Sequence, residues 1–146
     1  MRTRWDTGRR LFGAATVAVI VTLTGCRSGA VTHVVDGDTI DVDGRRVRFI
    51  GMDTPERGQC GYIEAKRRVA QLVSGKRVDV VSVPGDTVDR YGRELGYIQY
   101  RGLDIGKVLV AEGLAHARYD SLDGYHFHPR QGDYHATDAV TRNLCE

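Results

Sequence analysis

The stretch VTHVVDGDTIDVDGRRVRFIGMDTPE, residues 31–56, decides the fold. Its apolar and β-branched residues fall into three runs, at 31–35, 39–42 and 46–50, and an Asp-Gly pair lies in each gap. Asp-Gly between such runs is a strong short-range signal for a hairpin turn. The stretch therefore predicts a meander of three antiparallel strands.

Downstream of this meander the sequence predicts a helix, two strands and two further helices. The helix has apolar residues at helical spacing with Lys and Arg opposite, and Gly75 ends it. Asp104 is placed to cap the next helix. The five ranges are 62–73, 77–83, 94–100, 104–112 and 134–143. This order suits an α+β fold, either a small Greek-key barrel of the oligonucleotide-binding (OB) kind or another α+β sheet.

Composition indicates a single domain with little net charge. The chain has 146 residues, with 21 Lys and Arg against 19 Asp and Glu. Four of the cations and one of the acids precede Cys26, which leaves 17 against 18 afterwards. A strongly basic composition is the usual signature of binding nucleic acid by charge alone, and it is absent here. Any affinity for phosphate must come from local clusters.

Residues 1–25 are typical of an export signal. Four arginines precede an apolar run at 11–23, which is short for a membrane-spanning helix of ~20 residues. The run ends in Leu-Thr-Gly-Cys, which resembles a bacterial lipobox and predicts a lipid on Cys26. We expect 26–30 to form a short tether and 31–146 the domain. The mature protein is then exported, either anchored by Cys26 on the extracytoplasmic side of a membrane or secreted.

Export bears on the other two cysteines, because an oxidising compartment permits a disulfide that the cytosol would reduce. Cys60 and Cys145 are the remaining pair. Their union would close a long loop and stabilise the fold by up to ~4 kcal/mol in the chain-entropy model. Two unpaired thiols are the alternative.

Carboxylates and arginines cluster in the turns of the predicted sheet. Asp38 and Asp53 supply the oxygen ligands that hard cations such as Ca²⁺ prefer, although spacing alone does not show that they meet. Arg48 and Arg93 supply guanidinium groups that bind phosphate bidentately. Each motif taken alone is typical of an ordinary turn or surface hairpin. Together they contain the parts needed for phosphodiester hydrolysis.

In order and spacing the motifs resemble the staphylococcal (micrococcal) nuclease family, also called thermonucleases. The resemblance runs from about residue 31 to the C-terminus through DGDT at 36–39, Arg48, DTPE at 53–56, DRYGREL at 89–95 and GLA at 113–115. It implies a five-stranded OB barrel with three helices, and a Ca²⁺-dependent nuclease that hydrolyses DNA and RNA with little sequence preference and leaves 3′-phosphates.

The same resemblance assigns roles to individual residues. Asp38, Asp53 and the Thr54 carbonyl would ligate Ca²⁺. Glu56 would act as the general base or orient the attacking water. Arg48 and Arg93 would hold the scissile phosphate.

Substrate contacts are implied at Arg90, Tyr91 and Tyr119, since aromatic rings stack on bases without regard to sequence. The stretch after Glu56 departs from the family pattern, because it is shorter and carries Cys60. The expected protein is a monomer that degrades or scavenges nucleic acid. The alternatives are a catalytically silent binding module of the same fold and a calcium-binding structural domain.

Overall fold

The computed structural model describes residues 25–146. The predicted export signal therefore lies almost wholly outside the described residues. Within 25–146 no helix combines the length and apolar character needed to cross a membrane.

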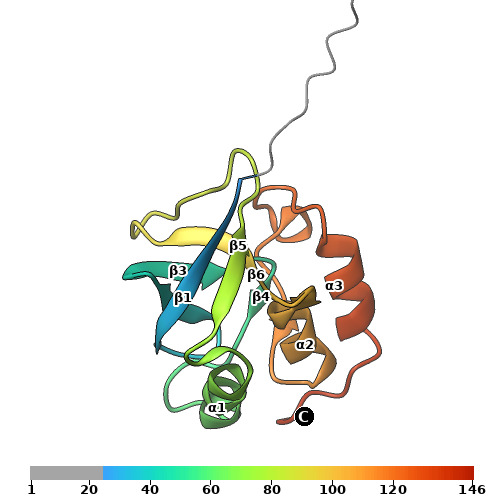
Figure 1. Ribbon diagram of the computed structural model, residues 1–146. Helices are drawn as coiled ribbons and strands as arrows, with labels where there is room; N and C mark the ends of the chain where they lie inside the picture. The colour runs from blue at the N-terminus through green and yellow to red at the C-terminus, as the bar shows by residue number, and fades with distance from the viewer. Residues whose placement is uncertain (1–24) are drawn as a thin grey trace, which may run out of the picture.

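Five strands close into a barrel, which confirms the predicted OB-type α+β fold (Figure 1). Neighbours around it follow the order β3-β2-β1-β5-β6 and are antiparallel, and a parallel pairing of β3 with β6 closes the ring. The strands are β1 Cys26–Val34, β2 Thr39–Val42, β3 Arg45–Phe49, β5 Arg77–Val81 and β6 Glu94–Tyr100.

Three shorter strands sit at the margins of the barrel. β7 Leu103–Asp104 pairs with β6 across a tight turn. β4 Met52–Asp53 pairs with β8 His116–Ala117 in a small separate sheet. This second pairing matters for function, because it joins the end of the 31–56 stretch to a segment more than sixty residues later.

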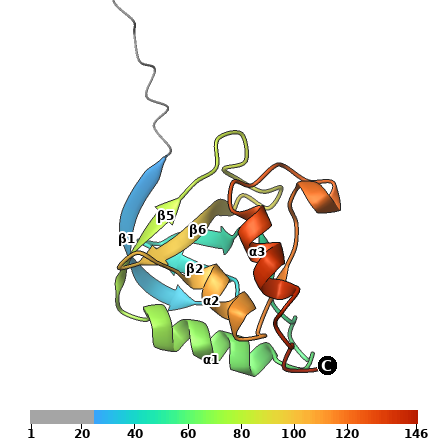
Figure 2. The same ribbon diagram turned by 90° about the vertical axis from the view of Figure 1, so that its right-hand side faces the viewer.

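Three helices cover one end and one side of the barrel (Figures 1 and 2). α1 Tyr62–Val73 has the predicted bounds and buries Ala65, Val69 and Val73. α2 Ile105–Ala111 is capped as predicted, since the Asp104 carboxylate accepts from the Lys107 N–H at 3.2 Å. α3 Gln131–Asp138 packs beside α2.

The third helix lies earlier than the predicted 134–143. It begins at Gln131 and ends at Asp138, and residues 139–141 continue as hydrogen-bonded turns. Tyr134, taken as the start of the helix, is instead its buried anchor, with the hydroxyl donating to Asp104 at 2.6 Å. A polar helix with one buried residue offers a weak periodic signal, so its bounds could not be read from the pattern.

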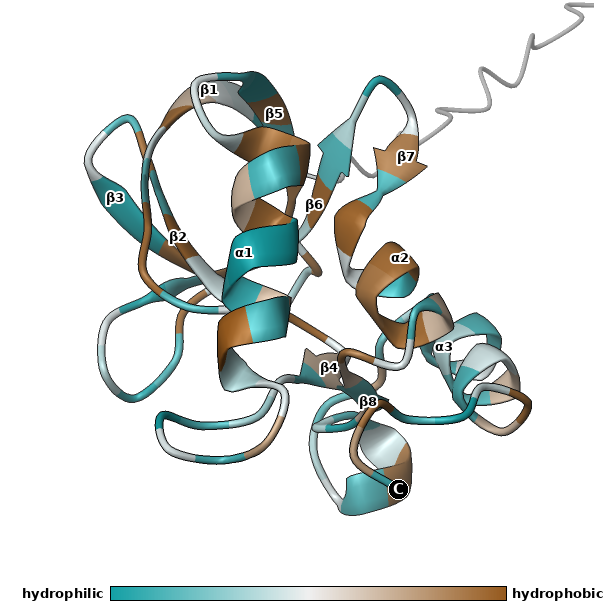
Figure 3. Ribbon diagram, turned by 90° about the horizontal axis from the view of Figure 1, so that it is seen from below, coloured by the Kyte–Doolittle hydropathy of each residue, from teal (hydrophilic) through white to brown (hydrophobic). Residues whose placement is uncertain are grey.

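The barrel interior and the inner faces of the helices form one continuous apolar core. In Figure 3, α1 shows both brown and teal surfaces, as an amphipathic helix should, whereas α2 is mainly brown. Fully buried side chains from several elements meet here: Ile40, Val42, Val47, Met52, Val69, Val73, Ile98, Ile105 and Leu109.

The predicted tether at 26–30 is wrong, because these residues form the first half of β1. They pair in register with β5, from Cys26 opposite Val81 to Ala30 opposite Arg77. A Cβ at Gly29 would lie 2.5 Å from side-chain atoms of Val42 and Asp43. Gly29 therefore permits close packing of β1 against the end of β2.

Candidate active site

The carboxylate of Asp38 is enclosed at the start of β2. Asp38 is 6% exposed, and its Oδ1 accepts a hydrogen bond from the Thr39 hydroxyl at 3.0 Å. Its Oδ2 accepts from the N–H of Thr54 at 3.1 Å and from the Thr54 hydroxyl at 2.9 Å. A Cβ at Gly37 would lie 2.8 Å from Thr54 side-chain atoms, so glycine permits this close approach. The turn before β2 and the loop after β4 are thereby locked together.

Arg48 lies between these two segments. Its neighbours Val47 and Phe49 are buried, so strand alternation directs Arg48 to the other face of β3. That face is not open to solvent, and the Arg48 side chain is only 11% exposed. Nη1 lies 2.7 Å from Asp38 Oδ2, and Nη2 donates to Asp53 Oδ1 at 2.9 Å. One guanidinium therefore bridges two carboxylates from different loops.

The positive charge of Arg48 only partly compensates the negative charges of Asp38 and Asp53. Burial raises the pKa of the Asp53 carboxyl, and the charge of Asp38 adds to the rise, while Arg48 opposes it. The net pKa stays above the ordinary value. The Tyr119 hydroxyl donates to the other Asp53 oxygen across a long 3.4 Å. The site therefore favours additional positive charge beside Asp53.

The residues present fit a hard divalent cation. Asp38, Asp53 and the Thr54 carbonyl form an oxygen-only donor set, which is what Ca²⁺ takes. No cluster of three or more His, Cys, Asp or Glu suited to a metal occurs in residues 25–146. Two carboxylates and a carbonyl leave further positions to water or substrate, as in sites where a metal takes part in a reaction.

Asp36, the first residue of the DGDT motif, is a neighbour of this pair to which the sequence assigned no role. Its Oδ1 accepts from the Asp38 N–H at 3.2 Å. Burial raises the pKa of the Asp36 carboxyl, and the adjacent charge of Asp38 raises it further. Acidic groups are thus concentrated around one small volume at the start of β2.

Glu56 lies in the exposed loop that follows Asp53. The loop is shaped by a turn in which the Gln59 N–H donates to the Glu56 carbonyl at 2.9 Å, and the Gln59 side chain accepts from the Glu56 N–H at 2.7 Å. Its far end is fixed by a disulfide between Cys60 and Cys145, with Cα atoms 6.0 Å apart. The loop is therefore tied to the C-terminal segment of the chain.

Arg93 sits at the end of the β5–β6 hairpin, held by its own turn. Asp89 accepts from Arg93 Nε at 2.6 Å and from the N–H groups of Tyr91 and Arg93, each at 2.9 Å. The guanidinium carbons of Arg90 and Arg93 lie 4.8 and 5.4 Å from the centre of the Tyr91 ring. Tyr91 is 68% exposed, so the ring and both cations form an open basic surface.

The structure thus brings some of the predicted residues into contact and leaves others apart. Asp38, Arg48, Asp53, Thr54 and Tyr119 form one contiguous cluster. The hairpin approaches it through the β3–β6 pairing, in which Leu95, two residues after Arg93, is the partner of Arg48. No hydrogen bond or ion pair joins Arg93, Arg90 or Tyr91 to the cluster in the described part of the chain.

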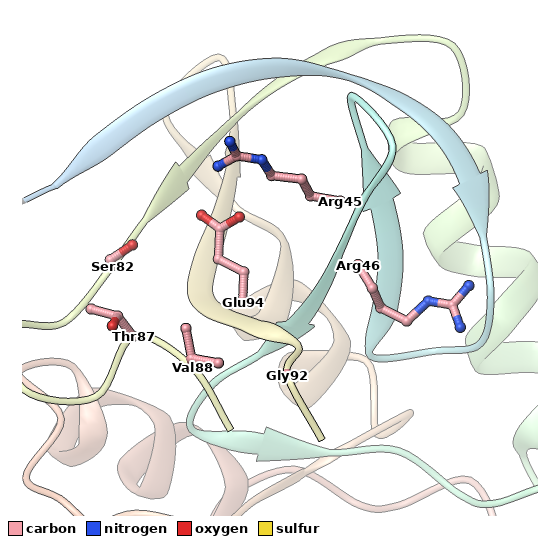
Figure 4. Close-up of a pocket in the computed structure, with 7 residues that line it drawn as sticks. All are labelled: Arg45, Arg46, Ser82, Thr87, Val88, Gly92 and Glu94. Carbon is pink, nitrogen blue, oxygen red and sulfur yellow. The ribbon is translucent and has the colours of Figure 1, made fainter. Parts of the chain in front are cut away.

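A separate pocket of about 440 Å³ opens beside β3 (Figure 4). Figure 4 shows the Arg45 guanidinium close to Glu94 and the Arg46 guanidinium turned away. Glu94 forms an ion pair with Arg27, and Arg46 forms one with Asp41 at 3.0 Å. None of the predicted site residues lines this pocket.

Sequence reasoning missed two further residues near the cluster. Asp89 orients Arg93, and its spacing of four residues from that arginine within a turn was a signal that could have found it. Arg118 follows β8 and lies near Asp53, where its charge lowers the pKa of the carboxyl. Only the pairing of β4 with β8 makes them neighbours, so no local pattern could have indicated Arg118.

Comparison with known proteins gives a consistent family match. The family model described as "Staphylococcal nuclease homologue" matches residues 46–137. This segment contains Arg48, Asp53, Glu56 and Arg93, and begins after Asp38.

Individual relatives carry nuclease names. "Micrococcal nuclease" of Shigella flexneri is 38% identical over 119 residues, covering 71% of this chain and 67% of that protein. "Endonuclease YncB" of Bacillus subtilis (strain 168) is 34% identical over 95 residues, covering 58% and 45%. "Thermonuclease" of Staphylococcus intermedius is 35% identical over 98 residues, covering 61% and 58%. The chain thus spans from under half to about two thirds of the length of these relatives.

Proposed function

The chain belongs to the staphylococcal nuclease family, and we propose that it is a calcium-dependent nuclease that hydrolyses the phosphodiester bonds of DNA and RNA. The observation that carries this proposal is the position of Arg48 between Asp38 and Asp53. It places a phosphate-binding guanidinium directly beside a pair of oxygen ligands for a cation.

In this proposal Ca²⁺ held by Asp38, Asp53 and the Thr54 carbonyl supplies positive charge to polarise the phosphate. Arg48 binds a non-bridging phosphate oxygen and stabilises the charge that grows as water attacks phosphorus. Arg93 reaches the same phosphate from the hairpin when substrate draws the guanidinium away from Asp89.

Glu56 supplies the proton acceptor. A water molecule forms the new oxygen–phosphorus bond while its proton passes to a Glu56 carboxylate oxygen. The bond from phosphorus to the 5′-oxygen breaks, and that oxygen takes a proton from solvent. The products are a 3′-phosphate and a 5′-hydroxyl. The exposed loop and its disulfide limit how far Glu56 can move from the cluster.

The proposal is tested by digesting plasmid DNA and RNA with the purified protein, with Ca²⁺ added and with a chelator. We expect cleavage with Ca²⁺, loss of cleavage on chelation, and 3′-phosphate ends. Glu56→Gln should bind nucleic acid normally and cleave it at least ~100-fold more slowly. Glu64→Gln, an exposed glutamate on α1, is the matched control and should behave as wild type. Binding without cleavage by the wild type would identify a silent binding module instead.

For location, we propose an exported protein carrying lipid on Cys26. The leader-like sequence before Cys26 supports this, and Cys26 is an exposed free thiol. Mass spectrometry of the membrane fraction should find a mature N-terminus at Cys26 with a lipid mass. An N-terminus still at Met1, or a soluble product cut well beyond Cys26, contradicts the anchor and leaves the nuclease proposal untouched.

A further inference from the structure

We propose that Arg118 and the pocket beside it form a subsite for the nucleotide that flanks the scissile phosphate. The inference rests on the proposed nuclease function and extends it to a residue outside the predicted site. It concerns how a strand of nucleic acid is held, and it is separate from the bond-breaking step.

Arg118 is exposed and differs from the other site arginines in its partners. Arg48 and Arg93 are each held by carboxylates. Arg118 forms no ion pair with a carboxylate anywhere in residues 25–146, and its guanidinium carbon instead lies 5.4 Å from the centre of the Tyr119 ring. A cation on an aromatic face keeps its N–H donors free for an incoming anion.

Its place is set by the small sheet next to the cluster. β8 pairs with β4, with His116 opposite Asp53, and the Arg118 N–H donates to the Gly51 carbonyl at 3.2 Å. The Arg48 guanidinium carbon lies 5.9 Å from the same Tyr119 ring centre. Two arginines therefore approach one tyrosine, one of them engaged by the carboxylates of the cluster and one free. This arrangement suits successive phosphates along one strand of nucleic acid, one phosphate at each arginine.

The backbone at Tyr119 is held in an unfavourable conformation that maintains this geometry. Its φ is 63°, in the left-handed region that non-glycine residues avoid, and its N–H donates to Asp123 at 2.7 Å. Strain of this kind persists where the surrounding structure fixes a residue for a purpose.

A pocket of about 370 Å³ extends from this point between the Glu56 loop and the C-terminal segment. Asp53, Thr54 and Arg118 are among the residues that line it, together with the polar side chains of Gln59, His116 and Asn143, the Cys60–Cys145 disulfide and Glu146. Its volume falls in the usual range of ~300–1,000 Å³ for pockets that take small molecules. Amide and imidazole groups can hydrogen-bond a sugar and a base edge. The phosphate of the flanking nucleotide would lie at Arg118, with its nucleoside in the pocket.

The test compares two substrates. Bis(4-nitrophenyl) phosphate has a phosphodiester bond and no flanking nucleotide, whereas a short single-stranded oligodeoxynucleotide has both. Arg118→Ala should raise the KM for the oligonucleotide about tenfold with little change in kcat, a loss of ~1.4 kcal/mol. Hydrolysis of the small phosphodiester should change much less than this tenfold, because that substrate has no flanking nucleotide. The dependence of log Kd on log salt should fall in slope by ~0.7, the value for one lost phosphate contact on a single strand.

Two further variants sharpen the result. Arg118→Lys keeps the charge and should retain part of the affinity. Arg77→Ala removes an exposed arginine from β5, away from the pocket, and should change neither substrate. Equal losses on both substrates would overturn the subsite, because Arg118 would then act on the reacting centre through Asp53. An unchanged KM for the oligonucleotide would overturn it as well.

Failure of the proposed function looks different. In that case the wild type hydrolyses neither substrate with Ca²⁺ present. Fluorescence anisotropy with a labelled oligonucleotide then still measures whether Arg118→Ala weakens binding relative to wild type and Arg77→Ala. Weaker binding supports the subsite without the enzyme, and equal binding by all three proteins refutes it.

Discussion

Two arginine–carboxylate sets, one on β3 and one directly before its parallel neighbour β6, are built differently. Arg48 is enclosed by Asp38 and Asp53, which come from segments on either side of β3. Arg93 is exposed to a greater degree and is held by Asp89 within a single turn. The first set forms only when separate loops meet in the folded protein, whereas the second forms within one turn of the chain.

The carboxyl pKa values show what this difference means. In the first set the net effect raises the pKa of Asp53, because burial and the charge of Asp38 outweigh the charges of Arg48 and Arg118. In the second set burial pushes the pKa of Asp89 upward, but hydrogen bonds from the Arg93 and Tyr91 N–H groups and from the Arg93 side chain outweigh it and leave the pKa lowered. The ionised form of Asp53 is thus less well stabilised than that of Asp89, and the cation proposed above would add positive charge beside Asp53.

Replacement of Arg48 by Lys should have the largest effect. Lys keeps the charge but not the fork that bridges two carboxylates, so turnover should fall about 1000-fold. The unfolding free energy should also fall by about 1–3 kcal/mol, because one buried carboxylate loses its partner. Kinetics and thermal unfolding measure the two effects. Arg46→Lys, on the same strand and paired with Asp41, is the control and should change neither.

Removal of the disulfide should loosen the Glu56 loop, which follows Asp53 of the first set, and should leave the hairpin that carries the second set unchanged. Cys60→Ser with Cys145→Ser opens a loop of 85 residues and should lower the unfolding free energy by about 2–4 kcal/mol. Hydrogen exchange should speed up at 56–61 and 143–146 and stay unchanged in the 82–93 hairpin. Wild type under reducing agent should match the variant, and the variant should not respond to that agent. Equal loosening of the hairpin would contradict the division into two regions.

Arg93→Lys should reduce turnover about 100-fold while leaving stability within ~0.5 kcal/mol of wild type, since its partner is local and partly solvated. Steady-state kinetics and unfolding on the same preparation would show this separation. Arg101→Lys is matched to it, because Arg101 also stacks on a neighbouring tyrosine in a turn. If Arg93→Lys retains near-wild-type turnover while correctly folded, Arg93 does not bind the scissile phosphate.

The same contrast explains what the sequence could predict. Local signals placed the meander, α1 and the cap of α2 well, because Asp-Gly turns, helical spacing and a capping carboxylate act over a few residues. The Asp89–Arg93 turn also depends on contacts over a few residues, so its spacing could have been recognised. The bridge from Arg48 to Asp38 and Asp53 depends on how loops meet, so the sequence did not predict it, and resemblance to a family implied only that the two carboxylates share a cation.

Other features escaped because their signals were ambiguous or absent. The small residues at 26–30 look like a linker, and their role in packing appears only when β1 lies against β2 and β5. Arg118 becomes a neighbour of Asp53 through a two-residue strand, too short for any periodic pattern. Long-range contacts between short segments are thus where sequence reasoning stopped.

Asp89→Asn should have the smallest effect, a loss of unfolding free energy that depends on pH. The pKa of Asp89 lies below its ordinary value of 3.8 in the folded protein, so its ionised form is the one that folding favours. The stability that it contributes is therefore fully present above about pH 4 and is lost as pH falls through the lowered pKa. Asn cannot ionise but its amide oxygen still accepts hydrogen bonds, so at neutral pH the variant should be less stable by about 1 kcal/mol, the scale of one ordinary hydrogen bond. On acidification the wild type should lose this advantage, and the unfolding free energies of the two proteins should converge.

Chemical unfolding at a series of pH values measures this difference in free energy, with Asp79→Asn on β5 as the control carboxylate. A difference that stays constant down to low pH would mean that Asp89 acts through the shape of its hydrogen bonds and that its charge contributes nothing to holding Arg93.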